Sequence, residues 1–289
     1  MKSKRNFIII FLIGVLFYVM ISLYISYCVL TVHTYNFQSD KVKDEIKFVI
    51  LSDLHDHEFG LGNEELIVKT RELSPDLILI LGDMLNNNSE NVKVSCELVK
   101  KLTQIAPVYY ALGNHEISYM EQHSDLVWML EQSGAVVLDK EFVDLNIAGT
   151  EIRLGGLYDY AFGLNGENKA EVTPNNVKHF LEEFQETEYL KIMMSHRPDS
   201  FIFGNASEYW DIDLVLSGHN HGGQVVLPFA GGVYGGDQGY FPEYVHGLYE
   251  KDGMNIFVTS GLSSNQKILP RFNNPPEIAV IICSENDYR

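Results

Sequence analysis

The stretch FVILSDLH, residues 48–55, decides the fold and locates the chemistry. Its first part, residues 48–52, is a short apolar run of the kind that forms a buried strand. Asp53 and His55 follow directly. Because residues i and i+2 of an extended chain project to the same side, a carboxylate and an imidazole point together at one space. That space has the size and the donors that a metal ion requires.

Similar apolar runs recur along the chain, and several of them end in polar residues. Besides 48–52, the predicted buried strands are 77–81, 108–112, 191–195, 214–217, 256–259 and 278–283. Helix-like stretches lie between some of them, at 64–73, 92–102, 123–132 and 175–186. Strands that alternate with helices predict an α/β layered domain. Residues 136–138 and 152–157 are expected to form a meander, which would make the sheet mixed.

Five polar motifs stand in order at the ends of these runs. They are Asp53-Leu54-His55, Gly82-Asp83, Gly113-Asn114-His115-Glu116, Ser195-His196-Arg197-Pro198 and Gly218-His219-Asn220-His221. Each motif alone is a weak signal, since Asp-x-His and Gly-Asp occur often by chance. All five in this order are a strong signal, because ligands of open α/β sheets lie outside the carboxyl ends of the strands.

With these motifs the sequence resembles the calcineurin-like metallophosphoesterases, from about Phe48 to Ile282. It looks closest to the bacterial membrane-associated branch, on residues 218–224 and 271–277. The resemblance implies an α/β fold, a four-layer αββα sandwich of two mixed β-sheets flanked by helices. It also implies hydrolysis of a phosphate ester or anhydride by a hydroxide that bridges two metal ions.

The resemblance assigns a role to each motif residue. One metal ion would be held by Asp53, His55 and His221, a second by Asn114, His196 and His219, and Asp83 would bridge both. His115 would be catalytic and donate a proton or a charge-assisted hydrogen bond to the leaving-group oxygen, with a positioning role as the alternative. Apart from the resemblance, the forked guanidinium of Arg197 suits binding of a substrate phosphate, and a solvated or structural Arg197 is equally open. The resemblance implies two divalent metal ions, and the oxygen and nitrogen donors fit Mn, Fe, Zn or Co.

Other polar and aromatic residues receive weaker interpretations. Glu116 is expected to orient its neighbours. The histidines outside the motifs are expected on the surface or on helix faces; they are His33, His57, His123, His179 and His246. The segment 228–249 is rich in Gly, Tyr and Phe, and it is either a substrate-facing loop or a packed loop.

The N-terminal part of the chain indicates a membrane anchor. Residues 7–30 contain no charge and no proline, and as a helix they would be about 36 Å long, enough to span a bilayer. The predicted organisation is a cytoplasmic N-terminus (1–6), a transmembrane anchor (7–30), a linker (31–45) and one catalytic domain (46–289). A cleaved signal peptide is the alternative, but the apolar core is long and residues 26–28 make a poor cleavage site.

The distribution of charge predicts the orientation of the chain and the class of partner. Lys2, Lys4 and Arg5 precede the apolar segment, whereas residues 31–40 carry no Lys or Arg, so a single-pass protein with its catalytic domain outside the cytoplasm is expected. The formal net charge of −18 repels polyphosphate backbones and argues against nucleic acid. Three cysteines without a CxxC pair argue against a disulfide framework, although one Cys96–Cys283 bridge stays open.

Together these observations predict a membrane-anchored, dinuclear-metal phosphoesterase. Its substrate would be a phosphodiester or a pyrophosphate, and a lipid-linked or cell-envelope compound is one candidate. The alternative is a non-catalytic, metal-stabilised binding module at the membrane. Such a module should have lost metal ligands or the histidine after Asn114, and this sequence retains all of them.

Overall fold

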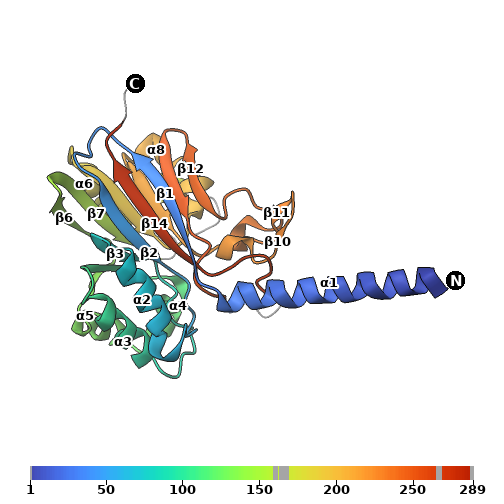
Figure 1. The fold of residues 1–289 in the computed structure, drawn as a ribbon. Coiled ribbons are helices and arrows are strands. Elements are labelled where there is room, and N and C mark those ends of the chain that lie inside the picture. The colour runs from blue at the N-terminus through green and yellow to red at the C-terminus, as the bar shows by residue number, and fades with distance from the viewer. Residues whose placement is uncertain (1, 159–161, 163–168, 265–268, 287–289) are drawn as a thin grey trace.

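The computed structural model describes residues 2–158, 162, 169–264 and 269–286 of the chain. Two six-stranded β-sheets pack face to face, and helices cover the outer face of each (Figure 1). Side chains from both sheets share the central core, among them Phe48 and Leu79 from one sheet and Ile192 and Leu216 from the other. Each sheet also packs against its own helices through one further apolar cluster. The predicted four-layer sandwich is confirmed.

The first sheet has the strand order β1-β14-β2-β3-β4-β5. Its strands are β1 (Thr31–Gln38), β14 (Glu277–Ser284), β2 (Ile46–Leu51), β3 (Leu77–Ile80), β4 (Val108–Ala111) and β5 (Val136–Leu138). Only the β14–β2 pair is antiparallel, so this sheet is mixed, as predicted.

The second sheet has the order β12-β13-β9-β8-β7-β6. Its strands are β12 (Gly247–Lys251), β13 (Met254–Val258), β9 (Leu214–Ser217), β8 (Leu190–Ser195), β7 (Thr150–Leu157) and β6 (Glu141–Ile147). Antiparallel hairpins form both edges around a parallel centre. A separate small hairpin consists of β10 (Val226–Leu227) and β11 (Gly231–Gly232).

The helices cover the sheets with their apolar faces. Against the first sheet lie α2 (Glu64–Glu72), α3 (Lys93–Leu102), α4 (Asn114–Met120) and α5 (Leu126–Gln132); against the second lie α6 (Asn175–Gln185), α7 (Asp199–Ile202) and α8 (Ala206–Tyr209). Short 3-10 turns occur at Leu61–Asn63, Ala170–Val172, His221–Gly223 and Gly236–Gln238. Helix α3 shows the pattern: Leu98, Val99 and Leu102 are buried, and the spacing of one and four residues puts them on one face.

Two local predictions differ from the structure. Residues 31–38 form strand β1, paired in parallel with β14, where the sequence suggested part of a linker. Most β1 side chains are exposed or half-buried, as on an edge strand, so no apolar period marks it. The predicted meander is also wrong, because β5 and β7 lie in different sheets. An apolar run predicts a strand but does not say which sheet receives it.

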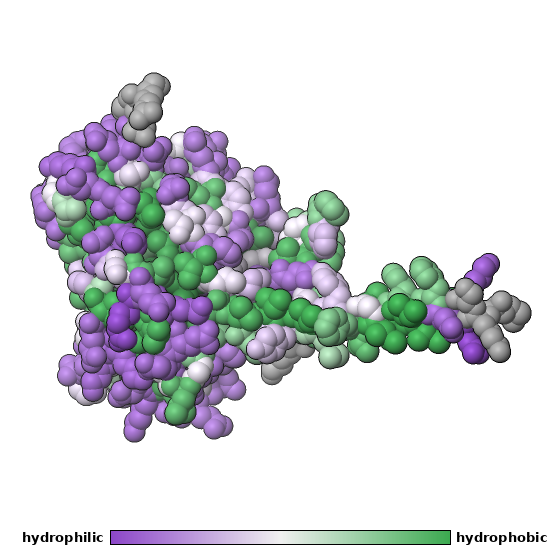
Figure 2. Space-filling model, viewed as in Figure 1, coloured by the Kyte–Doolittle hydropathy of each residue, from purple (hydrophilic) through white to green (hydrophobic). Residues whose placement is uncertain are grey.

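Helix α1 (Lys2–Cys28) projects away from the sandwich, and its surface is almost entirely apolar (Figures 1 and 2). By length and composition, Lys4–Cys28 is long and apolar enough to cross a membrane, and a signal sequence near the N-terminus would meet the same criterion. Only two residues, Val29 and Leu30, separate the end of α1 from β1, which begins at Thr31.

Candidate metal centre

The five polar motifs meet at one edge of the sandwich because each follows a strand that ends there. Asp53 lies two residues after β2, and Asp83 lies three residues after β3. Asn114 opens α4 shortly after β4. In the second sheet, His196 directly follows β8 and His219 lies two residues after β9. Residues from both sheets therefore face one space, which is the arrangement expected outside the carboxyl ends of strands.

The first group of metal-type side chains is Asp53, His55 and His221, whose ligand atoms all lie within 4.8 Å of one another. His55 Nε2 is 3.9 Å from Asp53 Oδ1 and also 3.9 Å from Asp83 Oδ2. The His221 ring is oriented by a hydrogen bond of 3.0 Å between its Nδ1 and the Ser263 carbonyl oxygen. That contact leaves Nε2 of His221 as the nitrogen available to an ion.

The second group is Asp83, His196 and His219. His196 Nε2 lies 3.2 Å from Asp83 Oδ2 and 3.3 Å from His219 Nδ1. The other ring nitrogen of His196 contacts the Leu81 carbonyl oxygen at 2.6 Å, which fixes the ring. Asp83 also forms a group with His55 and His115, so this one carboxylate adjoins both sides of the centre.

The backbone of the centre is strained at five of its polar residues. Positive φ angles occur at Asp53 (57°), His55 (50°), Asp83 (52°), His219 (68°) and His221 (45°). Such conformations cost a side-chain-bearing residue about 1–3 kcal/mol each and persist only where surrounding contacts impose them. Strain of this kind clusters at functional sites.

Close backbone packing imposes these conformations. A Cβ on Gly82 would lie 2.4 Å from the Gly113 nitrogen, and one on Gly218 would lie 2.1 Å from Ser52 Oγ. Only glycine permits strand ends to approach so closely. The glycines of the motifs are therefore needed to bring the ligand-bearing turns together.

Glu116 positions the turn that contains Asp83 through hydrogen bonds to backbone N–H groups. Its buried carboxylate accepts hydrogen bonds from the backbone N–H groups of Asp83 (2.7 Å), Met84 (2.8 Å) and Gly113 (3.0 Å). The Tyr110 hydroxyl donates a fourth, at 2.7 Å. Burial, reinforced by the charge of Asp83, raises the pKa of Glu116 to about 7. The prediction that Glu116 orients its neighbours is confirmed.

Several buried polar atoms of the centre lack a hydrogen-bond partner among the described residues. They are Asp53 Oδ1, both ring nitrogens of His55 and Asn114 Oδ1. A buried polar atom left unpaired costs about 1–3 kcal/mol. Carboxylate, imidazole and amide oxygen donors are those that divalent transition metals accept. The residues present therefore fit a metal centre.

The pKa values of three buried histidines also fit a metal centre. Burial lowers the pKa of His55 to about 3, and burial likewise lowers the pKa values of His219 and His221. Neutral imidazole is the form that binds metal. Burial alone would lower the pKa of His196 too, but the adjacent Asp83 carboxylate outweighs it and raises that pKa to about 10. A metal cation beside Asp83 would replace the proton of His196 as the positive charge that balances the Asp83 carboxylate.

His115 stands at the mouth of the centre with a defined tautomer. Its Nδ1 accepts a hydrogen bond of 3.0 Å from the backbone N–H of Asn87, so the proton of the neutral ring is on Nε2. Nε2 lies 3.9 Å from Asp83 Oδ2. The His115 backbone N–H donates to Asp83 Oδ1 at 2.8 Å. This side chain therefore presents an N–H donor toward the space between the ligands.

A pocket of about 80 Å³ opens over the centre. It is lined by Asp83, Asn114, His115, His219, Asn220, His221, Gln224, Tyr234 and Gly236. Tyr234 and Gly236 belong to the aromatic segment 228–249, so part of that segment faces the site. Arg197 is not among the lining residues, and its guanidinium forms an ion pair with Asp237. Sequence reasoning missed Gln224 and Tyr234 as lining residues, because neither has a characteristic spacing.

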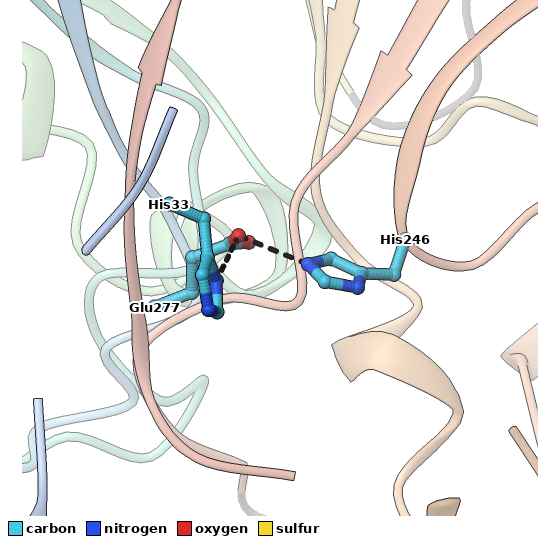
Figure 3. A group of neighbouring side chains, drawn as sticks. All are labelled: His33, His246 and Glu277. Atoms are coloured by element: carbon cyan, nitrogen blue, oxygen red, sulfur yellow. Dashed lines mark hydrogen bonds and ion pairs between the residues drawn. The ribbon is translucent and has the colours of Figure 1, made fainter. Parts of the chain in front are cut away.

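A second cluster of metal-type residues lies elsewhere, where Glu277 is flanked by His33 and His246 (Figure 3). Glu277 Oε1 lies 3.0 Å from His33 Nδ1, 2.9 Å from His246 Nε2 and 2.7 Å from the Tyr35 hydroxyl. Its Oε2 accepts from the Thr259 hydroxyl (2.6 Å) and the Ser260 N–H (2.8 Å).

All the acceptor capacity of Glu277 is thus used by protein donors, in contrast to the orphaned atoms of the first centre. The cluster is complete without an ion. His33 on β1 and His246 beside β12 come from edges of different sheets, and we call the group the Glu277 clamp (His33, Tyr35, His246 and Glu277). The sequence suggested only surface histidines for these positions, and nothing local revealed their common partner.

Comparison with known proteins agrees with this architecture. The model of the calcineurin-like phosphoesterase family matches residues 46–223. A metallophosphoesterase of Campylobacter jejuni, Cj0846, is 31% identical over 233 residues, which cover 76% of this chain and 54% of that protein. The phosphodiesterase YaeI of Escherichia coli is 27% identical over 239 residues, or 81% of each chain.

The chain spans little more than half the length of Cj0846. Among solved structures, a phosphopantetheinyl hydrolase from Mycobacterium tuberculosis aligns with a TM-score of 0.47 and 13% identity, over 76% of this chain and 91% of that one. The family model alone covers more than half of the present chain and includes the strands that carry all five motifs. The chain belongs to the calcineurin-like phosphoesterase family.

Proposed function

We propose that this protein is a membrane-anchored, dinuclear-metal phosphoesterase that hydrolyses a phosphodiester or pyrophosphate bond. One observation carries the proposal: metal-type side chains from both sheets converge on one space in which buried ligand atoms lack protein partners among the described residues. Membership in the phosphoesterase family supports the same reaction class.

Seven residues would hold the ions. Asp53, His55 and His221 would bind one, Asn114, His196 and His219 the other, and Asp83 would lie between them. The mixture of oxygen and imidazole donors suits Mn, Fe, Zn or Co. When bound, two divalent ions neutralise phosphoryl oxygens and lower the pKa of the attacking water.

The chain supplies orientation and a hydrogen-bond donor. His115 holds its proton on Nε2, because the Asn87 N–H occupies Nδ1, and this N–H would donate a hydrogen bond to the leaving-group oxygen as negative charge develops there. Glu116 keeps the Asp83 turn in place through hydrogen bonds to two of its N–H groups. Arg197 forms an ion pair with Asp237, the residue after the pocket-lining Gly236, and is a candidate to exchange that partner for a substrate phosphate.

The N-terminal helix supports attachment to a membrane. It is long and apolar enough to span, and basic residues lie only on its N-terminal side within the first turns. This distribution of charge favours a single-pass protein with its catalytic domain outside the cytoplasm. A lipid-linked or cell-envelope phosphoester would then be within reach. Carbonate extraction of membranes and detection of the intact N-terminus test the anchor against a cleaved signal sequence.

The reaction is tested with the full chain in detergent. We expect chelation to abolish hydrolysis of bis-p-nitrophenyl phosphate and added Mn, Zn, Fe or Co to restore it. We expect Asp83→Ala to lose about 10³-fold or more in kcat, because both ions share this ligand. His115→Ala should lose about 10²-fold in kcat while retaining its metal content, as expected when a hydrogen-bond donor to the leaving-group oxygen is removed.

The matched control is Trp128→Ser, an exposed aromatic on α5 that should leave kcat unchanged. Elemental analysis reports the number of ions bound. A folded protein that holds two ions and turns over neither a diester nor a pyrophosphate would contradict the proposal. That result would favour the metal-stabilised binding module.

A further inference from the structure

The last turns of α1 do not stand free of the domain. Tyr18, Ser22 and Ser26 follow one another at intervals of four residues and so share one face of the helix. The Ser22 hydroxyl donates to Asn273 Oδ1 at 2.7 Å, and Ser22 Oγ accepts from the Asn273 N–H at 2.9 Å. The Tyr18 hydroxyl bonds the same side chain, at 2.9 and 2.7 Å. Ser26 accepts from the Asn274 N–H at 3.1 Å.

The same asparagine fastens the β10–β11 hairpin beside the helix. Asn273 Nδ2 donates to the Val226 carbonyl oxygen at 3.3 Å, and the Val226 N–H donates to the Phe272 carbonyl at 2.9 Å. The Tyr18 and Phe272 rings make an edge contact at 5.9 Å. Figure 1 shows the hairpin projecting from the sandwich on the side on which α1 leaves it.

The segment 226–241, which includes this hairpin, carries four exposed apolar side chains, which we call the aromatic rim: Leu227, Phe229, Tyr240 and Phe241. Phe229 is fully exposed, Tyr240 is 73% exposed and Phe241 61%. No Lys or Arg occurs between residues 198 and 250. The rim therefore lacks the positive charge that would attract anionic groups. Exposed aromatic side chains are, however, typical of a membrane–water interface.

The length of α1 fixes the depth at which the rim lies. A helix needs about 20 residues to cross the hydrocarbon of a bilayer. Twenty residues counted from Asn6, just past the last charge, reach Ile25. The helix before Tyr18 is too short to span alone, since residues 7–17 make only about 16 Å. The spanning part must therefore include Tyr18 and Ser22, with the domain segments bound to them.

Tyr18 then lies seven residues, or about 10 Å, inside the outer boundary of the hydrocarbon. Interfacial amphipathic elements bury their apolar faces about 5–10 Å into the boundary of headgroups and acyl chains. The hairpin that Asn273 holds at the level of Tyr18 is thus brought to this depth. The buried Ser22 and Ser26 hydroxyls are satisfied by protein, as polar groups at such a depth require.

The segment that carries the aromatic rim, 226–241, also contributes residues to the lining of the metal pocket. Tyr234 and Gly236 are lining residues, and a Cβ on Gly236 would lie 3.2 Å from His219 Nε2. The Tyr234 ring contacts that of Tyr240, on the rim, at 5.5 Å. One segment, 226–241, therefore joins the rim to the mouth of the pocket.

We propose that the aromatic rim is a second membrane contact, which enters the lipid bilayer beside α1 and opens the metal pocket at the headgroup level. The substrate class that this position selects is a phosphoester or pyrophosphate of an amphiphile whose apolar tail stays in the bilayer. This choice of substrate rests on the proposed hydrolase function, whereas the membrane contact does not.

The membrane contact is tested by fluorescence quenching on the full chain in phosphatidylcholine vesicles that contain lipids brominated near the headgroup. Phe229→Trp adds an emitter on the rim. We expect the added emission to fall at least two-fold with brominated lipid, at low and high salt alike. The wild-type chain is the control: Trp128 is exposed on α5, remote from α1 in Figure 1, Trp210 is buried, and neither should be quenched. If the added emission is the same with and without bromine, the contact is overturned.

The substrate class is tested with Phe229→Ser/Phe241→Ser and the control Trp128→Ser, both in vesicles. We expect the double variant to hydrolyse a diester with a long acyl tail, embedded in the same vesicles, at least 10-fold more slowly. Its rate on soluble bis-p-nitrophenyl phosphate should stay within two-fold of wild type. Trp128→Ser should change neither rate. Equal loss on both substrates, or loss on neither, overturns the substrate class.

The two proposals fail in different ways. If the added emitter of Phe229→Trp is quenched but the wild-type chain hydrolyses neither ester, the proposed function is lost and the membrane contact is kept. If the wild-type chain hydrolyses the soluble ester but the added emitter is not quenched, the function is kept and the membrane contact is lost.

Discussion

At the scale of single residues, the geometry of the candidate metal centre depends on side chains outside the proposed ligand set as well as on the proposed ligands. Glu116 illustrates this, since its two oxygens accept three N–H groups and one hydroxyl around the Asp83 turn. Only a carboxylate can do so, because every donor there points at an oxygen.

Glu116→Gln should therefore destabilise the fold and weaken metal binding. The amide NH₂ would face the Tyr110 hydroxyl, which can turn to accept, and the Met84 N–H, which would become an unpaired buried donor at a cost of about 1–3 kcal/mol. The bonds from the N–H groups of Asp83 and Gly113 would remain but would lose the charge of their acceptor. We expect a loss of about 2–4 kcal/mol in chemical denaturation and a lower metal content. Tyr110→Phe removes one donor and leaves the carboxylate intact, so its loss should be about 1 kcal/mol. Equal stability of Glu116→Gln and wild type would contradict this role.

The motif residues could be found from the sequence alone, because each motif is a short local pattern of polar residues that directly follows an apolar run. The partners that surround them were not visible. Gln224 and Tyr234 reach the pocket through loops whose course follows from packing, and the ion pair of Arg197 with Asp237 joins residues forty apart. The assigned roles of His115 and of the seven ligands remain predictions, and the structure adds their proximity and their burial.

At the scale of elements, the buried strands were predictable and the edges were not. Strands such as β3 and β9 are continuous apolar runs, buried at every position. Strand β1 alternates poorly because it lies at an edge, and its pairing with β14 joins segments about 245 residues apart. No local pattern encodes such a partner. The Glu277 clamp is a product of this pairing, since β1 brings His33 and Tyr35 to Glu277.

The clamp predicts a pH dependence of stability with two limbs. Burial opposes the charge of Glu277, but hydrogen bonds from His246 and His33 hold its pKa well below the usual 4.5; stability from this group is therefore present above about 4.5 and lost as pH falls. The bond to Glu277 raises the pKa of His33 above 6.5; its contribution is complete below about 6.5 and lost as pH rises through the raised value.

The contribution of the clamp should consequently be largest between about pH 4.5 and 6.5. We expect Glu277→Gln to lose about 2 kcal/mol in this window, as for hydrogen bonds to a charged group, and to flatten both limbs. His33→Ala should flatten the alkaline limb and only weaken the acid limb, because His246 still bonds Glu277. Urea unfolding measured across both limbs checks this, and parallel curves for Glu277→Gln and wild type would refute it.

At the scale of the whole molecule, the sandwich and the metal centre should be thermodynamically coupled. The proposed ligands come from both sheets, so ions would bind the folded chain only. At a free concentration 100-fold above Kd, each bound ion would stabilise the fold by about 2.7 kcal/mol. We expect chelation to lower Tm by roughly 5–10 °C per site, at about 2–4 °C per kcal/mol. Calorimetry with and without chelator measures this shift, and Asp83→Ala should be insensitive to the chelator.

Only Val29 and Leu30 separate the end of α1 from strand β1, and Leu30 is itself buried. If α1 spans a membrane, as proposed, this short connection would prevent the sandwich from rotating independently of its helix. Any change in the tilt of α1 turns the catalytic face by the same angle. Tilt responds to the mismatch between helix length and hydrocarbon thickness. In a protein anchored in this way, the thickness of the surrounding bilayer would therefore set the orientation of the catalytic face relative to the membrane surface.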